Sequence, residues 1–112
     1  MQAAAPSTIT RPAPRRARPP HVRPHTVRVT GEVDLDTGAS IVDAVDRLRA
    51  RHPGLPIIVD TSAVSFIDPA GYRALRTALS RVDGTPDPLV SHHVGRAVLR
   101  LEVVLELVTR SA

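Results

Sequence analysis

A pair of aspartates and a pair of histidines are the side chains of this chain best suited to chemistry. Asp34 and Asp36 could share general acid–base work in an extended segment. His92 and His93 could ligate a metal ion, but adjacent side chains point in different directions and do not converge on one ion. We therefore expect polar turn aspartates and structural or surface histidines, with no catalytic residue, no metal and no cofactor.

Other catalytic patterns are also missing from the sequence. The chain has no cysteine, which excludes a thiolate nucleophile and a disulfide framework. It has no Gly-rich phosphate loop and no Ser/His/Asp arrangement on predicted elements. An orphan enzyme using Asp34, Asp36 and His92 is the weakest alternative, and replacing Asp34 or His92 would abolish turnover only if that alternative held.

The chain has 112 residues, a length sufficient for one domain. Its charge is distributed unevenly along the sequence. All 15 basic residues are arginine, a usage typical of a GC-rich bacterial source. Residues 1–25 hold five arginines and no acid, whereas residues 26–112 hold 10 arginines and 11 acids. The basic character therefore belongs to the N-terminal segment, and we expect no specific nucleic-acid partner. Its arginines could contact anionic surfaces without specificity.

The N-terminal segment is also rich in proline. Residues 1–25 hold six of the 11 prolines, which removes backbone donors and prevents helix or sheet from propagating. We predict a disordered tail over 1–25 and a folded domain over 26–112. The segment lacks the apolar region of a secretory signal, and the chain has no apolar run long enough to span a bilayer. With no cysteine to oxidise, these features favour a cytoplasmic protein.

The sequence of the domain predicts alternating strands and helices. Val27 and Val29 predict a strand that ends at Gly31, followed by a polar turn over 34–38. Ser40 then predicts the cap of a helix with Ile41, Val45 and Leu48 on its apolar face, and His52-Pro53-Gly54 ends it. Residues 57–59 predict a strand buried on both faces, followed by a loop.

The second half of the domain continues this alternation. Asp68 predicts an N-cap and Pro69 the first helical position of a helix with an apolar stripe of Tyr72, Leu75, Leu79 and Val82. A short strand at 89–90, a helix over 94–101 and a final strand or helical tail over 104–108 follow. The order predicts an α/β domain with helices packed on a mixed sheet.

These elements carry a resemblance to the STAS domain, the fold of bacterial anti-sigma factor antagonists. Residues 31–34 resemble the family's Gly-Glu-Leu-Asp turn, and residues 59–68 resemble its approach to the phosphorylation site. Val90-Ser91 and the apolar helix after it resemble its C-terminal strand and helix. The family usually has another strand before the first turn, and the tail takes that place here.

The phosphorylation site departs from the family pattern. The family turn usually reads Asp-Ser-Ser-Gly, and a partner kinase phosphorylates its first serine. This chain has Pro69 and Ala70 at the two serine positions, so we expect no phosphorylation there. Thr61, Ser62 and Ser65 are nearby hydroxyls, and we expect loop hydrogen bonding from them.

The resemblance implies a non-enzymatic protein-interaction module. Its expected partner is an anti-sigma factor of the serine-kinase type, and binding would free a sigma factor. The alternatives are a STAS-like subunit of a larger assembly, such as a lipid-transport complex or a stress-signalling scaffold, and a decayed copy. The expected contact residues are Asp34, Asp36, Thr37, Asp68, Pro69, Ala70, Gly71, Arg73 and Arg76. Of these, Asp68 would organise the helix end and Gly71 would let a partner backbone come close.

Overall fold

A four-stranded parallel sheet organises the residues that the computed structural model describes, 7–10 and 25–111. The strands, which lie side by side in chain order, are β1 (Ser7–Thr10), β2 (His25–Val33), β3 (Ile57–Ile67) and β4 (Val90–His93). The helices are α1 (Leu35–Arg51), α2 (Pro69–Ala78) and α3 (Arg96–Ser111). The predicted α/β class, with helices packed on a sheet, is confirmed. We expected a mixed sheet, whereas all three strand pairs described are parallel.

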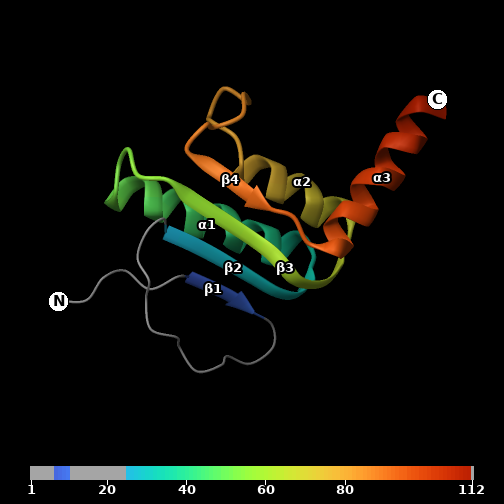
Figure 1. Cartoon of the computed structure of the whole chain (residues 1–112), viewed down its shortest axis with the longest axis horizontal. Helices are drawn as coiled ribbons and strands as arrows, with labels where there is room; N and C mark the ends of the chain where they lie inside the picture. Colours follow the sequence, from blue (N-terminus) through green and yellow to red (C-terminus); the bar gives the residue numbers. More distant parts are fainter. Residues whose placement is uncertain (1–6, 11–24, 112) are drawn as a thin grey trace.

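Helices α1 and α2 lie side by side behind the sheet, and α3 stands at its end (Figure 1). The core between these layers holds β-branched residues from the strands and one apolar stripe from each helix. Its most deeply buried members are Val27, Val29, Val59, Ile41, Val45, Leu75 and Val98. Burial of each such side chain stabilises the fold by about 1.5–3 kcal/mol.

Strand β1 corrects the prediction for the N-terminal segment. Ser7–Thr10 pairs in parallel with β2, from Ser7↔Val27 to Thr10↔Thr30, so the predicted disorder is wrong for these four residues. Three of these four residues are β-branched (Thr8, Ile9 and Thr10), and β-branched residues favour strands. The strand that they form covers the open edge of β2. Residues 1–6 and 11–24 lie outside the described residues, so the rest of the predicted tail and its boundary at residue 26 stay predictions.

Helix α1 begins six residues earlier than predicted. Asp34 has extended backbone and its carboxylate accepts a hydrogen bond from the Thr37 amide at 3.0 Å, so Asp34 is the N-cap. The predicted polar turn over 34–38 is the cap and first turn of the helix. Ser40 does not cap the helix, because its hydroxyl donates to the Asp36 carbonyl one turn back, at 3.3 Å.

Strand β3 is longer than predicted. The segment after Val59, expected to be a loop, stays paired with β2 as far as Ile67. Its pairing is irregular between Arg28 and Thr30 and between Gly31 and Glu32, and such bulges disturb the simple alternation of buried and exposed residues. The prediction that residues 57–59 are buried on both faces of the sheet is only partly right, because Ile58 is half-buried.

The other two helices also differ from the predicted pattern at their C-terminal ends. Helix α2 ends at Ala78, so Val82 lies beyond it and is fully exposed, at 108%. Helix α3 runs without a break to Ser111, which confirms a helical tail over 104–108 and excludes a strand there. None of the helices described is both long and apolar enough to cross a membrane.

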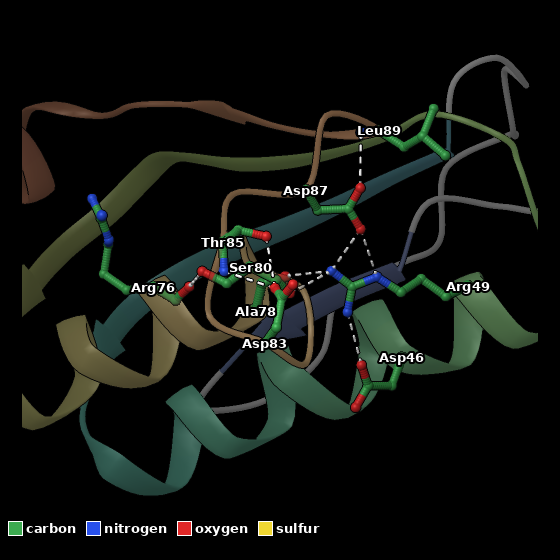
Figure 2. A network of polar contacts seen from close by, with 9 residues as sticks. All are labelled: Asp46, Arg49, Arg76, Ala78, Ser80, Asp83, Thr85, Asp87 and Leu89. Atoms are coloured by element: carbon green, nitrogen blue, oxygen red, sulfur yellow. Dashed lines mark hydrogen bonds and ion pairs between the residues drawn. The ribbon is translucent and has the colours of Figure 1, made fainter.

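Arg49 fixes the loop between α2 and β4 to α1 (Figure 2). Its guanidinium donates to the Asp87 carboxylate at 3.2 Å, to the carbonyls of Ala78 and Ser80 at 3.2 and 3.0 Å, and to Asp46 at 3.0 Å. The Arg49 side chain is accordingly only 29% exposed. The long, planar guanidinium lets one residue join three segments of the chain.

Candidate functional site

Two aspartate caps lie at the same edge of the sheet, where the neighbouring parallel strands β2 and β3 end. Asp34 follows β2 and accepts from the Thr37 amide, and Asp68 follows β3 and accepts from the Gly71 amide at 2.7 Å. The Asp68 amide donates to the Val33 carbonyl at 3.2 Å, which ties the two strand ends together. Both helices therefore start side by side at this edge.

Two glycines allow the helix starts to pack closely. A Cβ atom on Gly71 would stand 2.4 Å from the Val33 carbonyl oxygen, and one on Gly38 would stand 2.5 Å from the Ala74 Cβ. Both glycines are buried. The expectation that Gly71 admits a partner backbone is wrong, because the backbone that approaches it belongs to Val33 of the same chain.

An open groove runs between the outer faces of α1 and α2. Its volume is about 490 Å³, and most of its lining is aliphatic. Leu35 is 62% exposed here, although leucine side chains are usually buried. Asp43 and Arg73 supply charges of opposite sign. The full lining is Leu35, Ala39, Val42, Asp43, Ala70, Arg73, Ala74 and Thr77.

The structure divides the predicted contact residues into three groups. Asp36, Pro69, Arg73 and Arg76 are exposed; Asp34, Asp68 and Ala70 are half-buried; Thr37 and Gly71 are buried. Ala70 and Arg73 line the groove. Thr37 is 4% exposed, so it is not a contact residue on this surface. Asp34 and Asp68 hold the helix starts, and each uses one carboxylate oxygen for its cap.

Sequence reasoning missed most of the groove. Leu35, Ala39 and Val42 are spaced four and three apart, which is the spacing of one helical face. That signal was missed because Ser40 was predicted to cap the helix, which left Leu35 in the predicted turn and Ala39 before the cap. With the helix starting at Leu35, these three residues form a second apolar stripe beside the buried one.

The three hydroxyl residues that precede Asp68 on β3 differ in exposure. Thr61 is 1% exposed, and its hydroxyl lies 3.2 Å from the His93 carbonyl, 3.1 Å from the Gly95 amide and 2.9 Å from His92 Nε2. A carbonyl can only accept and an amide can only donate, so this hydroxyl is used within the fold. Ser62 and Ser65 are exposed on β3.

The histidine pair is split between two environments. His92 is half-buried against Thr61, and burial lowers its pKa below the ordinary value of 6.5. His93 is exposed. In residues 7–10 and 25–111, no group of three or more potential metal ligands gathers.

Two further ionisable groups lie near this histidine pair. Burial and the hydrogen bond to Glu102 raise the pKa of Tyr72, whose hydroxyl donates to the Glu102 carboxylate at 3.0 Å. Burial alone would raise the pKa of Asp60, but hydrogen bonds from Ser62 and the charges of His93 and Arg28 lower it overall. Both groups connect elements of the fold, and neither faces the groove.

Comparison with known proteins gives one family match. A family model described as "Mlab, STAS domain" matches residues 20–108, which include both helix caps and the groove. A hydrolase named pyiE from Pyricularia grisea is 37% identical over 60 residues, which is 54% of this chain. This chain covers 13% of that hydrolase. No solved structure matches.

Proposed function

This chain belongs to the STAS domain family, whose model matches residues 20–108, and on that premise we propose that it acts as an anti-sigma factor antagonist. The family is generally non-enzymatic and indicates a protein-interaction module. The proposed partner is an anti-sigma factor of the serine-kinase type in the bacterial cytoplasm, and binding frees a sigma factor. No cofactor takes part. The folded unit proposed for this role includes β1 (Ser7–Thr10), which pairs with β2, in addition to the predicted domain over 26–112.

The open groove between α1 and α2 is the observation that supports this proposal. Leu35, Ala39 and Val42 give it an apolar floor, and Asp43 and Arg73 supply charge. Protein interfaces commonly combine an apolar centre with a polar rim and are enriched in arginine. Among the other predicted contact residues, Asp36 and Pro69 are exposed in the first turns of α1 and α2, and Arg76 is exposed in the last turn of α2.

The proposed complex is constitutive. In the family, a phosphate on the serine at this helix start adds negative charge and breaks the complex. Pro69 and Ala70 stand at the serine positions and have no hydroxyl. The Thr61 hydroxyl is buried, which removes one nearby substitute. The antagonist therefore binds its kinase without being released by phosphorylation at this turn.

A second candidate function is a subunit of a larger assembly, such as a lipid-transport complex or a stress-signalling scaffold. The same residues, Pro69 and Ala70, favour it, because a permanent interface needs no phosphorylation switch. The matched hydrolase does not argue for enzymatic activity here, because this chain covers only 13% of that protein. Its activity belongs to that whole protein.

A matched pair of α1 variants tests the proposal. Ala39 and Ala50 are both exposed alanines of α1, but only Ala39 lines the groove. Full-length wild type, Ala39→Arg and Ala50→Arg are used as baits in lysate of the source cell, and captured proteins are identified by mass spectrometry. The leading proposal predicts that wild type and Ala50→Arg enrich an ATP-binding anti-sigma kinase and that Ala39→Arg loses it.

Other results of this experiment separate the remaining candidates. Enrichment of transporter or scaffold subunits, lost with Ala39→Arg, supports the second candidate. A kinase retained by Ala39→Arg contradicts the assigned surface. If the wild type enriches no protein above a matrix without bait, both candidate functions fail and a decayed copy becomes the simplest explanation.

A further inference from the structure

Helix α3 carries a basic and apolar face that the groove does not use. Its inward side packs on the fold: Val98 is fully buried, Leu101 and Leu105 are half-buried, and Glu102 accepts from the Tyr72 hydroxyl. On its outward side, Leu99, Val103 and Leu107 are 53%, 51% and 58% exposed. The C-terminal half of the helix extends away from the sheet (Figure 1).

The exposed apolar residues cover a wide arc of the helix. At about 100° per residue, Leu99, Val103, Leu107, Val104 and Val108 spread over an arc of about 180°. All five are exposed. One partner helix contacts an apolar stripe roughly 100° wide, so it would leave part of this arc in water. A broad, nearly flat surface covers the arc better.

The charges on this arc have one sign. Arg96, Arg100 and Arg110 fall within it, whereas Glu102 and Glu106 lie outside it, at about 40° and 80° when Val98 is set to zero. Arg110 pairs with Glu106 at 3.1 Å. Within residues 7–10 and 25–111, Arg96 and Arg100 have no ion-pair partner. The arc therefore suits a negatively charged occupant.

A second copy of this chain does not meet that requirement. Antiparallel pairing about Val103 places Arg96 of one copy opposite Arg110 of the other and Arg100 opposite Glu106, which lies outside the arc, whereas parallel pairing places each arginine opposite itself. Like charges facing each other across an interface oppose association. Either register therefore brings arginines of the arc against each other, and the arc itself holds no acidic residue that could pair with them.

We propose that the outward face of α3 docks on an anionic lipid bilayer surface. Leu99, Val103 and Leu107 enter the boundary between headgroups and acyl chains. Arg96 and Arg100 lay their aliphatic stems along this face and extend their guanidinium groups to the lipid phosphates. The helix lies in the plane of the surface and does not cross it. This site is separate from the groove, so both could be occupied together.

Vesicle flotation of the full chain tests the proposal, using phosphatidylcholine vesicles with and without phosphatidylglycerol. We expect binding to the anionic vesicles only. Val103→Asp should weaken it about tenfold or more, because a carboxylate opposes insertion. Arg96→Gln with Arg100→Gln should weaken it about thirtyfold. Val82→Asp is the matched control, an exposed valine outside α3, and should leave binding unchanged.

The variants also separate α3 from the arginines of residues 1–25, which every variant retains. Anionic binding that survives both α3 changes would assign the lipid contact to that segment and overturn the proposal. Equal binding to both vesicle types, or to neither, would also overturn it. If the chain self-associates without lipid and Val103→Asp abolishes that association, the face is assigned to a second copy. If the chain captures an acidic protein and does not bind vesicles, the face is assigned to a protein partner. Circular dichroism of each variant verifies that α3 is folded.

Discussion

The carboxylate of Asp68 accepts a hydrogen bond of 2.7 Å from the backbone amide of Gly71, across the first residues of α2. Pro69 and Ala70, which replace the family's two serines, lie between them. The Asp68 amide in turn donates to Val33 at the end of β2. The helix start is thus held by a carboxylate cap and a close strand contact, and neither requires a hydroxyl at residues 69 and 70.

Removing this cap should destabilise the fold. Asp68→Ala leaves the Gly71 amide without its side-chain acceptor and should lower the free energy of unfolding by about 1 kcal/mol. Asp68→Asn keeps an acceptor oxygen and should lower it less. Urea unfolding followed by circular dichroism measures both. Equal stability of Asp68→Ala and wild type would contradict the cap's energetic role.

The close contact between Gly38 and Ala74 predicts that exchanging the large and small residue at these two positions changes the stability of the fold in a coupled way. Gly38→Ala puts a Cβ atom 2.5 Å from that of Ala74, so the helices must move apart, at a cost of about 1–3 kcal/mol. Ala74→Gly removes the obstructing atom, so the double variant should be more stable than the sum of the two single effects predicts. Thermal or urea unfolding of the four proteins gives this coupling energy. Strict additivity would show that α1 and α2 do not meet at this point.

Arg49 should be difficult to replace. Arg49→Ala breaks contacts to Asp87 and to the carbonyls of Ala78, at the end of α2, and Ser80, and should lower the free energy of unfolding by about 1–3 kcal/mol. Arg49→Lys should recover little, since an ammonium group lacks the planar fork that reaches several acceptors. Arg47→Ala, an exposed arginine of the same helix, is the control. An Arg49→Lys variant as stable as wild type would contradict this prediction.

Stability should increase with pH around the ordinary histidine pKa. Burial lowers the pKa of His92 below 6.5, so between the two values the unfolded chain binds more protons than the folded one. The contribution of His92 to the free energy of unfolding therefore increases as pH rises through that window, and it is lost as pH falls through the window. Asp60, whose pKa lies below 3.8, acts in a more acidic window.

His92→Gln tests this assignment, with the exposed His93→Gln as its control. Melting temperatures measured between mildly acidic and neutral pH should show a smaller pH dependence in His92→Gln than in wild type, whereas His93→Gln should change it less. The same slope in wild type and His92→Gln would exclude His92 as the source.

The sequence predicted the elements whose signals are local. Asp68 followed by Pro69 marks a helix start through the cap and the missing amide hydrogen, and the structure confirms both. Val27 and Val29 alternate with polar residues and form a buried strand. The α/β class follows from the order of such elements.

Features that depend on distant contacts could not be predicted in this way. The strand at Ser7–Thr10 exists because β2 offers an edge, although the prolines around it argue for disorder. Gly38 resembles a turn residue, and only the packing of α1 against Ala74 explains a glycine inside the helix. That misplaced helix start also hid Leu35 and Ala39, and with them the groove.

The measurement that tests the proposed constitutive binding most directly is the response of the captured complex to Mg-ATP. Wild type and Pro69→Ser are each bound to the captured anti-sigma kinase, and phosphate incorporation and complex dissociation are followed by intact mass and size-exclusion chromatography. We predict that wild type gains no phosphate and stays bound, whereas Pro69→Ser is phosphorylated and released. Phosphorylation and release of wild type would contradict the account.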